Sequence, residues 1–456
     1  MSMKSEKSKL SGYEFYERVL GSPRYIVAPM VDQSELPSSQ THTKAWRILA
    51  RRYGANLFAD PKYPKYKDLN FDISSGEEGN SVIDRPLIVQ FCGNDPETLL
   101  KAAKIVEPYC DAVDINFGCP QDIARRGRYG CFLQDDWDLV YRMKKTVEYA
   151  KMMESAGAQI LACHGRIREQ RGVNSGLADW DKIRAVKEAV KVPVFANGNV
   201  LYASDVIRCL QHTRADGLMT AEGQLYNPAL FASLPRLIAQ ETFNKATPPP
   251  PSHLAALSPS PHSVHHSADF PDYAIDILAH PSHVDLALEY LDIVKSLKTI
   301  TTLSAVKGHL FKIMKPALGI EIDLRDRLGK VRGGHGALDE YEAICREMKE
   351  RLDKKVELVK DKSLLQLIQP DPKTGLTTLP HWLAQPYIRP LPPAPQDKNK
   401  SNSERFVKDI TNATNTVPAT GSRTSATKRA SVNDGDDDYD NDLCEREDLE
   451  LKRIKR

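Results

Sequence analysis

Residues 112–130 read Ala112-Val-Asp-Ile-Asn-Phe-Gly-Cys-Pro-Gln-Asp-Ile-Ala-Arg-Arg-Gly-Arg-Tyr-Gly130. The stretch opens with a short apolar strand, predicted over 112–116, which runs into a Gly-Cys-Pro turn. A loop dense in arginine and glycine follows the turn. A strand that ends directly in polar residues is typical of the carboxyl edge of a parallel sheet, where α/β enzymes place their chemistry.

The same arrangement repeats along the first half of the chain. Short apolar strands end in polar or glycine-bearing loops, and amphipathic helical stretches separate them. Continuous apolar strands that alternate with helices indicate an α/β fold with a parallel sheet covered on both faces. The further predicted strands are 25–28, 87–91, 159–163, 193–196 and 215–219, with a stub at 56–58.

Two parallel folds fit this alternation, an open doubly wound sheet and a TIM (β/α)8-type barrel. An open sheet concentrates functional residues at one switch point, whereas a barrel collects them from the ends of many strands. Here functional-looking residues follow nearly every strand, so we predict the barrel. They are Pro29, Met30, Gln90, Cys119, His164, Asn197, Gly198, Asn199, Ala221 and Glu222.

Composition divides the chain into further parts. We predict an N-terminal segment over 1–20, the barrel over 21–243 and a linker rich in Pro, Ser and His over 244–284. The linker contains His262, His265 and His266, but its low complexity favours a disordered spacer over a metal site. A smaller helical domain follows over 285–357, and then an extension over 358–395. The polar tail, 396–456, is predicted to be disordered.

Charge and cysteine usage limit the class of protein. The chain has 456 residues and a net charge of +2, so nucleic-acid affinity must come from a local patch. Its eight cysteines include no Cys-x-x-Cys pair, which argues against a metal site and a disulfide framework and favours a reducing compartment. We see no secretory signal, and no apolar run reaches the roughly 18 residues of a membrane span. We expect a soluble intracellular protein without metal, in the cytoplasm, the nucleus or both.

The helical domain carries a local basic excess, with nine Lys or Arg against three acids between 295 and 332. Leu303, Val306, Leu310 and Ile313 recur at helical spacing and predict one apolar stripe. Cations off that stripe are either an ordinary solvated face or contacts to RNA phosphate. The candidates for such contacts are Lys307, Lys312 and Lys315.

Two glycine-bearing loops end the series of strands. Barrels that bind phosphorylated cofactors usually hold the phosphate after their last two strands. Asn197-Gly-Asn199 and Thr220-Ala-Glu-Gly223 occupy those places, and although one such loop alone could be a simple turn, the tandem favours a flavin mononucleotide (FMN) phosphate. Gln90 and His164 would then hydrogen-bond the flavin ring. Backbone and thioether contacts to the ring would come from Pro29, Met30 and Val31.

Cys119 is the candidate for proton chemistry. An isolated cysteine is usually a small buried hydrophobe, but this one follows a strand and precedes cationic side chains. A thiol with an ordinary pKa of about 8.5 is protonated at neutral pH and can act as an acid. The arginines near it are candidates for contacts to RNA phosphate: Arg125, Arg126 and Arg128, together with Arg166 after a later strand.

Several motifs together resemble the tRNA-dihydrouridine synthases, and most closely the eukaryotic branch that acts on uridines 16 and 17 of the D-loop. Matching segments run over about 24–240, 285–335 and 381–390. The motifs are Ala28-Pro-Met-Val-Asp-Gln-Ser-Glu35, Asn116-Phe-Gly-Cys-Pro-Gln121, Arg126-Gly-Arg-Tyr-Gly130, His164-Gly-Arg-Ile-Arg-Glu-Gln-Arg-Gly172, Ala196-Asn-Gly-Asn199 and Ala221-Glu-Gly223.

The resemblance implies a barrel that binds FMN and a helical domain that binds tRNA. It implies that flavin, reduced by NADPH or NADH, passes hydride to C6 of a uracil while Cys119 protonates C5. The base must leave the RNA stack to reach such a site. We expect a monomer with tRNA as its partner.

The chain departs from the family pattern at three places. Residues 37–44 look like an insertion, and Phe58-Ala-Asp-Pro61 stands where the family has a Tyr-Thr-Pro-Met strand end. Between 138 and 159 the chain lacks a strand with a Cys-Lys-Ile-Arg motif, whose lysine contacts flavin in the family. A βα unit takes on the order of 30 residues, which this span cannot hold. We therefore predict a barrel that lacks one βα unit and part of another.

Three hypotheses stand beside an active tRNA reductase. The chain could be the product of an incompletely spliced or misread synthase gene. It could be a flavin barrel that acts on free pyrimidines and does not need the basic helical domain. It could also be an inactive RNA-binding protein, which the missing strand favours.

Overall fold

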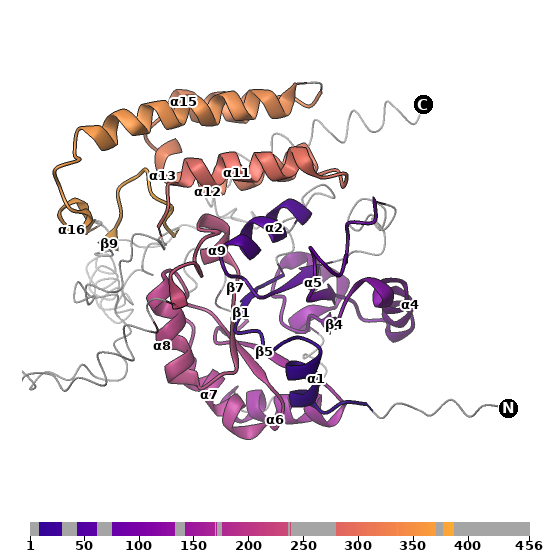
Figure 1. Cartoon of the computed structure of the whole chain (residues 1–456). Coiled ribbons are helices and arrows are strands. Elements are labelled where there is room, and N and C mark those ends of the chain that lie inside the picture. The colour runs from indigo at the N-terminus through magenta and orange to yellow at the C-terminus, as the bar shows by residue number, and fades with distance from the viewer. Residues whose placement is uncertain are drawn as a thin grey trace, which may run out of the picture. The chain divides into compact units, whose positions relative to one another are not determined.

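A computed structural model describes residues 9–29, 43–61, 75–132, 142–168, 170, 176–235, 238, 280–334, 336–370 and 377–386 (Figure 1). Most of the predicted linker and the whole predicted tail lie outside these ranges. Met30 and Val31, two of the predicted flavin contacts, lie outside them as well.

Seven parallel strands form one sheet in the order β4-β3-β2-β1-β7-β6-β5. The fold class predicted from the sequence is confirmed, and β5, β6 and β7 each end one residue later than predicted. The strands are β1 Tyr25–Val27, β2 Leu57–Pro61, β3 Leu87–Phe91, β4 Ala112–Ile115, β5 Leu161–His164, β6 Val194–Asn197 and β7 Gly217–Thr220.

The predicted stub at 56–58 is a complete strand, β2, and the sequence prediction was wrong about its length. β2 pairs with β1 through Leu57 and Phe58 and with β3 through all four residues from Phe58 to Pro61. Pairing on both sides satisfies the backbone hydrogen bonds of this short segment. The two neighbouring strands therefore stabilise a strand that its own residues favour only weakly.

Over the described residues, the sheet curls like a barrel but is open at one place. β7 pairs with β1, so the last strand meets the first as barrel closure requires. Among the described residues, β4 pairs only with β3 and β5 pairs only with β6. The opening between β4 and β5 falls where the sequence was predicted to lack a βα unit.

Side chains alternate between the barrel interior and the surrounding helices. Ile26, Leu57, Ile88, Phe195 and Met219 point inward and form one buried cluster. Their neighbours along the strands pack outward against helices such as α7 and α8. The surrounding helices are α4 Pro96–Val106, α6 Arg142–Ser155, α7 Trp180–Ala189 and α8 Ala203–Thr213 (Figure 1).

Helix α1, Gly12–Arg18, covers the amino end of the strands. The hydroxyl of Tyr16 donates to the carbonyl oxygens of Pro23 and Asp216, which precede β1 and β7. A Cβ on Gly12 would lie only 2.6 Å from the carbonyl oxygen of Gln159, ahead of β5. The amino end is thus closed by packing, and the chemistry is left to the carboxyl end.

The first helix of the predicted helical domain, α11, begins at His283. Val306, Leu310 and Ile313 are fully buried, which confirms the predicted apolar stripe, and Leu303 packs at its edge. The helices are α11 His283–Ser296, α12 Leu303–Ile313, α13 Lys315–Leu318, α14 Ile322–Lys330, α15 Ala337–Glu357 and the short α16 Leu364–Leu367. Two short strands follow, β8 Gln369–Pro370 and β9 Thr377–Thr378.

Helix α2, Lys44–Arg52, joins this domain to the barrel. Trp46 is fully buried, stacks on His309 of α12 with ring centroids 4.4 Å apart, and donates from its indole N–H to Gln224. Ala45 and Leu49 belong to the same apolar cluster as α11, α12 and α15. One face of a barrel helix is therefore part of the core of the helical domain.

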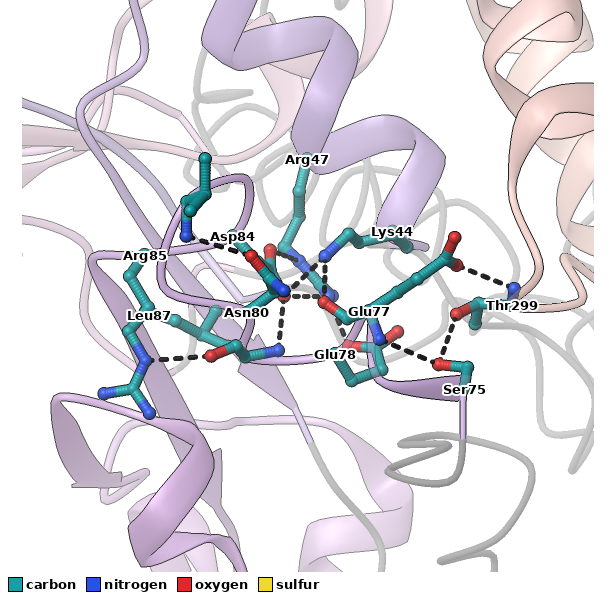
Figure 2. A network of polar contacts seen from close by, with 12 residues as sticks. Lys44, Arg47, Ser75, Glu77, Glu78, Asn80, Asp84, Arg85, Leu87 and Thr299 are labelled. Carbon is teal, nitrogen blue, oxygen red and sulfur yellow. Dashed lines mark hydrogen bonds and ion pairs between the residues drawn. The ribbon is translucent and has the colours of Figure 1, made fainter.

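The opposite side of α2 carries a buried ionic network (Figure 2). Arg47 binds both carboxylate oxygens of Asp84 at 2.9 Å and also donates to Glu78. The ammonium of Lys44 lies 3.1 Å from Asp84, and neither side chain is exposed. Burial would raise the pKa of Asp84, but the charges of Arg47 and Lys44 lower it to about 2.

This network continues into the helical domain through Glu77. Its carboxylate accepts hydrogen bonds from the N–H groups of Lys298 and Thr299, at 3.1 and 2.8 Å. The hydroxyl of Thr299 also donates to Ser75 at 3.0 Å, and Lys44 donates to the carbonyl oxygen of Glu77 (Figure 2). The loop before α12 is thereby bound to the barrel.

Candidate active site

Cys119 follows β4 at the carboxyl end of the sheet. Asn116 closes the strand, and its Oδ1 accepts hydrogen bonds from the N–H groups of Gly118 and Cys119, both at 2.9 Å. The carbonyl oxygen of Cys119 accepts from the N–H of Cys131 at 3.2 Å. The backbone on either side of the thiol is thus fixed, and the thiol itself is only half-buried.

The environment keeps this thiol protonated. Burial raises the pKa of Cys119, and the backbone N–H of Gln121 only partly offsets that effect. Cys92, which follows β3, donates to the carbonyl oxygen of Asn116 at 3.5 Å. Its pKa is raised to about 12, chiefly by burial and then by Cys119. Both thiols are neutral at pH 7, as an acid requires and a thiolate nucleophile does not.

Gln90, a predicted flavin contact, is tied to the loop of Cys119. Its Nε2 donates to Asp114 at 2.6 Å, and its Oε1 accepts from the Nδ2 of Asn116 at 3.0 Å. Asp114 and Asn116 were not among the predicted site residues. Asp114 could have been noticed as a carboxylate inside an apolar strand, directly opposite Gln90 in the parallel register.

The two glycine loops after β6 and β7 lie against each other. A Cβ on Gly223 would lie 2.3 Å from the carbonyl oxygen of Val200, so glycine permits this approach. Gly198 and Asn199 have positive φ values of 120° and 60°. Within the described ranges, their backbone N–H groups have no hydrogen-bond acceptor. Two consecutive unpaired donors at a strand end suit an anion such as phosphate.

The side chain of Asn199 holds this loop in place. Its Oδ1 accepts from the N–H of Ala178 at 2.7 Å, and its Nδ2 donates to the carbonyl oxygen of Ala178 at 2.6 Å. The indole of Trp180 donates to the carbonyl oxygen of Gly198 at 3.1 Å. Only the backbone of Asn199 is therefore available to a ligand.

His164 packs on the same loop. Its Nδ1 lies 2.9 Å from the carbonyl oxygen of Asn197, so Nδ1 carries the proton and Nε2 can accept one. Desolvation lowers the pKa of the imidazole, although part of the ring is accessible to solvent. The ring is neutral at pH 7. The structure thus brings together His164, Asn197 and Gly198, three of the predicted flavin contacts.

The remaining predicted cofactor contacts lie on neighbouring strand ends. Val27 pairs with Thr220, so Pro29 and Ala221 each follow one of two adjacent strands. Glu222 begins the short helix α9, Glu222–Tyr226. Arg166, predicted to contact RNA, donates to the carbonyl oxygen of Gly176 at 2.9 Å and to Asn199 at 3.4 Å, and so supports the loop after β6.

The family is decided by sequence comparison. The profile of the family described as dihydrouridine synthase (Dus) matches residues 26–148 and 142–258. This chain belongs to the dihydrouridine synthase family. The two matched segments meet in α6, at the point where the described sheet lacks a strand.

Relatives within the dihydrouridine synthase family cover most of the chain. One from Schizosaccharomyces pombe is 39% identical over 420 residues, which span 84% of this chain and 92% of the relative. One from Saccharomyces cerevisiae is 37% identical over 428 residues, spanning 84% and 87%. Both are named tRNA-dihydrouridine(16/17) synthase, with NAD(P)(+) in the name. A protein from Rattus norvegicus named as like this synthase is 38% identical over 420 residues, spanning 87% and 80%.

The other residues that we predict to contact RNA in this Dus-family chain differ in exposure and in hydrogen bonding. Arg125, Arg126 and Arg128 are exposed on and just after α5, Asp122–Gly127. Lys307 donates to the carbonyl oxygens of Gly329 and Val331, at 2.9 and 3.0 Å, and so binds the end of α14. Lys312 is half-buried.

Lys315 lies beside the predicted phosphate loops. Its ammonium lies 5.6 Å from the ring centroid of Tyr226 in α9. Burial lowers its pKa, while the carboxylate of Glu222 raises it. The helical domain thus places a cation at the end of β7.

No helix among the described residues is long and apolar enough to span a membrane.

Proposed function

We propose that this protein reduces uridine in tRNA to 5,6-dihydrouridine, at positions 16 and 17 of the D-loop, with bound FMN and with NADPH or NADH as reductant. Family membership and the names of the relatives support the reaction class. The observation that carries the mechanism is a neutral thiol, Cys119, held at the same end of the sheet as two glycine loops that suit a phosphate. Such a protein works where tRNA is present, in the cytoplasm, the nucleus or both.

The residues present fit FMN at the ends of β6 and β7. The unpaired N–H groups of Gly198 and Asn199 would hold its phosphate. His164 would accept a hydrogen bond at Nε2, and Gln90 retains one N–H and one lone pair after its contacts within the protein. When bound, FMN supplies a hydride to C6 of the uracil ring.

Cys119 completes the reduction by proton transfer. As C6 gains the hydride, the C5=C6 double bond is lost and negative charge builds at C5 and O4. The Sγ–H bond of Cys119 breaks and its proton is transferred to C5, which yields the saturated ring and a thiolate. Solvent then returns the proton to sulfur, because burial makes the thiolate unfavourable.

Cations at the same end of the protein would hold the RNA. The uracil must leave the stack to enter the site, so the phosphates around it need fixed contacts. Exposed Arg125, Arg126 and Arg128 follow the loop of Cys119, and Lys315 lies beyond β7. Lys307, Lys312 and Arg166 complete the proposed set, although Lys307 and Arg166 also support the protein itself.

A second candidate function rests on the opening between β4 and β5. The family resemblance implies a strand there whose lysine contacts flavin, and the described sheet lacks it. A protein that binds tRNA without reducing it is the function this observation favours. Whether the protein binds flavin distinguishes the two candidate functions.

The test compares the wild-type protein with Cys119→Ala. Wild-type protein supplied with FMN should be yellow, oxidise NADPH and add two hydrogens to D-loop uridine, as measured by mass spectrometry of tRNA. Cys119→Ala should keep the colour and NADPH oxidation but lose the product. A colourless protein that still binds tRNA would favour the second candidate. Full product from Cys119→Ala would overturn the acid assignment.

A further inference from the structure

We propose that Asp114 is a positioning residue that acts on Cys119 through two side-chain amides. The proposal rests on the proposed function, because it concerns the proton-transfer step assigned to Cys119. It adds a residue that touches neither the thiol nor the site expected for the flavin phosphate. Its evidence is a continuous series of hydrogen bonds across β3 and β4.

The series runs from the carboxylate to the backbone of the acid. Asp114 Oδ2 accepts from Gln90 Nε2 at 2.6 Å, and Gln90 Oε1 accepts from Asn116 Nδ2 at 3.0 Å. Asn116 Oδ1 then accepts from the N–H groups of Gly118 and Cys119, both at 2.9 Å. Three side chains thus form a chain of contacts that ends at the residue bearing the thiol.

A carboxylate at the end of this series fixes its direction. An amide can turn over and exchange its oxygen with its nitrogen, whereas an ionised carboxylate only accepts, and the hydrogen bonds from Gln90 and from the N–H of Ile115 favour this ionised form against the effect of burial. Asp114 therefore forces Gln90 to present its nitrogen, which leaves the oxygen of Gln90 for Asn116. Asn116 must then donate to Gln90 and turn its own oxygen toward Cys119. With the opposite direction, the NH2 group of Asn116 would face two N–H groups and release the loop.

The surroundings of Asp114 differ from those of the carboxylate in the ionic network. Two cations contact Asp84, whereas no cation pairs with Asp114 in the part of the chain that the structure describes. Burial raises the pKa of Asp114, and hydrogen bonds from Gln90 and from the N–H of Ile115 only partly offset this. A carboxylate kept in an apolar strand without a cation is poorly explained by stability alone.

The first experiment uses a double-mutant cycle on pre-reduced protein with tRNA. Asp114→Ala should slow dihydrouridine formation in a single turnover by about 10- to 100-fold, the scale of a small misplacement of a reacting group. The rate of NADPH oxidation should fall much less, because Gln90 is only one of the proposed flavin contacts. In the Cys119→Ala background, Asp114→Ala should not lower the residual single-turnover rate any further, because the two residues act in one step. Losses that add in the double variant would overturn the proposal.

A matched control is the aspartate at the other end of the same strand. Asp111 accepts from the N–H of Leu87 at 2.8 Å and pairs with Arg85 at 3.0 Å, ahead of β4. Asp111→Asn should disturb the strand without a selective effect on proton transfer. An equal selective loss in Asp111→Asn would mean that any damage to β4 suffices, which contradicts the proposal.

A second pair of substitutions moves the carboxylate from position 114 to position 90. Gln90→Glu alone places two carboxylates side by side and should impair product formation. Adding Asp114→Asn should restore much of the rate, because the carboxylate introduced at position 90 then accepts from the amides on both sides of it. Asn116 would again donate from its Nδ2 to position 90, and its Oδ1 would still accept from the N–H of Cys119. This pair also decides the question if Asp114→Ala fails to fold, and absence of rescue would overturn the directional argument.

Amide hydrogen exchange gives a readout that needs no flavin. The N–H groups of Gly118 and Cys119 should be protected in the wild-type protein and exchange faster in Asp114→Ala, while Asp111→Asn should leave them unchanged. Unchanged exchange in Asp114→Ala would refute the positioning role. Product formed by Cys119→Ala would instead refute the proposed function, so the two failures are distinguishable.

Discussion

At the scale of single residues, Gly198 occupies a position that only glycine fits. Its φ is 120°, and a Cβ there would lie 2.6 Å from the Cβ of Ala178 and 3.0 Å from the imidazole of His164. We expect Gly198→Ala to lower the free energy of unfolding by about 1–3 kcal/mol. Because His164 must shift, FMN affinity should fall too. Urea unfolding and flavin titration measure the two effects.

The control for this substitution is Gly21→Ala. Gly21 has a φ of 73°, but a Cβ there would meet no atom within 4 Å. That variant carries backbone strain without a clash and should keep its FMN affinity. Equal loss of FMN affinity in both variants would show that contact with His164 is not what matters at Gly198.

The protonation of Cys119 predicts a pH dependence. Burial raises the pKa of the thiol, so its acid form persists above the ordinary thiol value of about 8.5. Single-turnover formation of dihydrouridine by pre-reduced protein should therefore stay constant through that pH and fall only at more alkaline pH. A rate that already falls with an apparent pKa below the ordinary value would contradict a buried thiol acid.

Site residues could be predicted from the sequence where they lie at the end of an apolar strand. Cys119, Gln90 and His164 each follow or close an apolar strand, and the structure places all three at the carboxyl end of the sheet. Asp114 and Asn116 were missed because their role depends on the register between β3 and β4, which sets Gln90 opposite Asp114. That register is a tertiary property that one strand does not encode.

At the scale of elements, the fit of α2 depends on the buried charge of Asp84. Asp84→Asn would leave Arg47 and Lys44 without their shared partner, so we expect a loss of about 3–5 kcal/mol in the free energy of unfolding. Asp339, which is exposed and paired with Lys295, offers a control, and Asp339→Asn should change little. Comparable losses from both substitutions would contradict the argument.

The same group predicts how stability changes in acid. The pKa of folded Asp84 is about 2, below the value of about 3.9 for an unfolded aspartate. Its contribution is fully present above the unfolded pKa and is lost as pH falls through the folded pKa. Wild-type protein should therefore lose more stability than Asp84→Asn as pH falls from about 4 to about 2. Equal acid sensitivity of the two proteins would rule this out.

The predicted secondary structure is confirmed for most elements, because their apolar residues recur at helix or strand spacing and polar residues mark where the strands end. The stripe of α12 and the six longer predicted strands are examples. β2 was underestimated because Leu57–Pro61 ends in Asp and Pro, which rarely favour strands. Its two neighbours in the sheet supply the pairing that its own sequence does not predict.

At the scale of the whole molecule, the core of the helical domain includes one face of the barrel helix α2. Trp46 of α2 is fully buried among residues of α11, α12 and α15, and Glu77 binds the backbone before α12. Removal of the helical domain would expose this face of α2. A deletion therefore cannot distinguish a tRNA reductase from an enzyme for free pyrimidines, whereas charge reversal at exposed Arg128 leaves the core intact.

Among the described strands, the opening between β4 and β5 leaves one edge of each strand unpaired. Val113 and Ile115 face away from the barrel interior and are each 40% exposed, because the described helices leave the outer side of β4 partly uncovered. Inserting the corresponding βα segment of a family member should pair both open edges and bury these side chains.

We expect that insertion to raise the urea midpoint and the m-value, since unfolding would expose more surface, and to strengthen FMN binding. A glycine-serine segment of the same length, inserted at the same point, controls for chain length and should do neither. If the two inserted proteins unfold alike, the unpaired edges of β4 and β5 are not what limits stability.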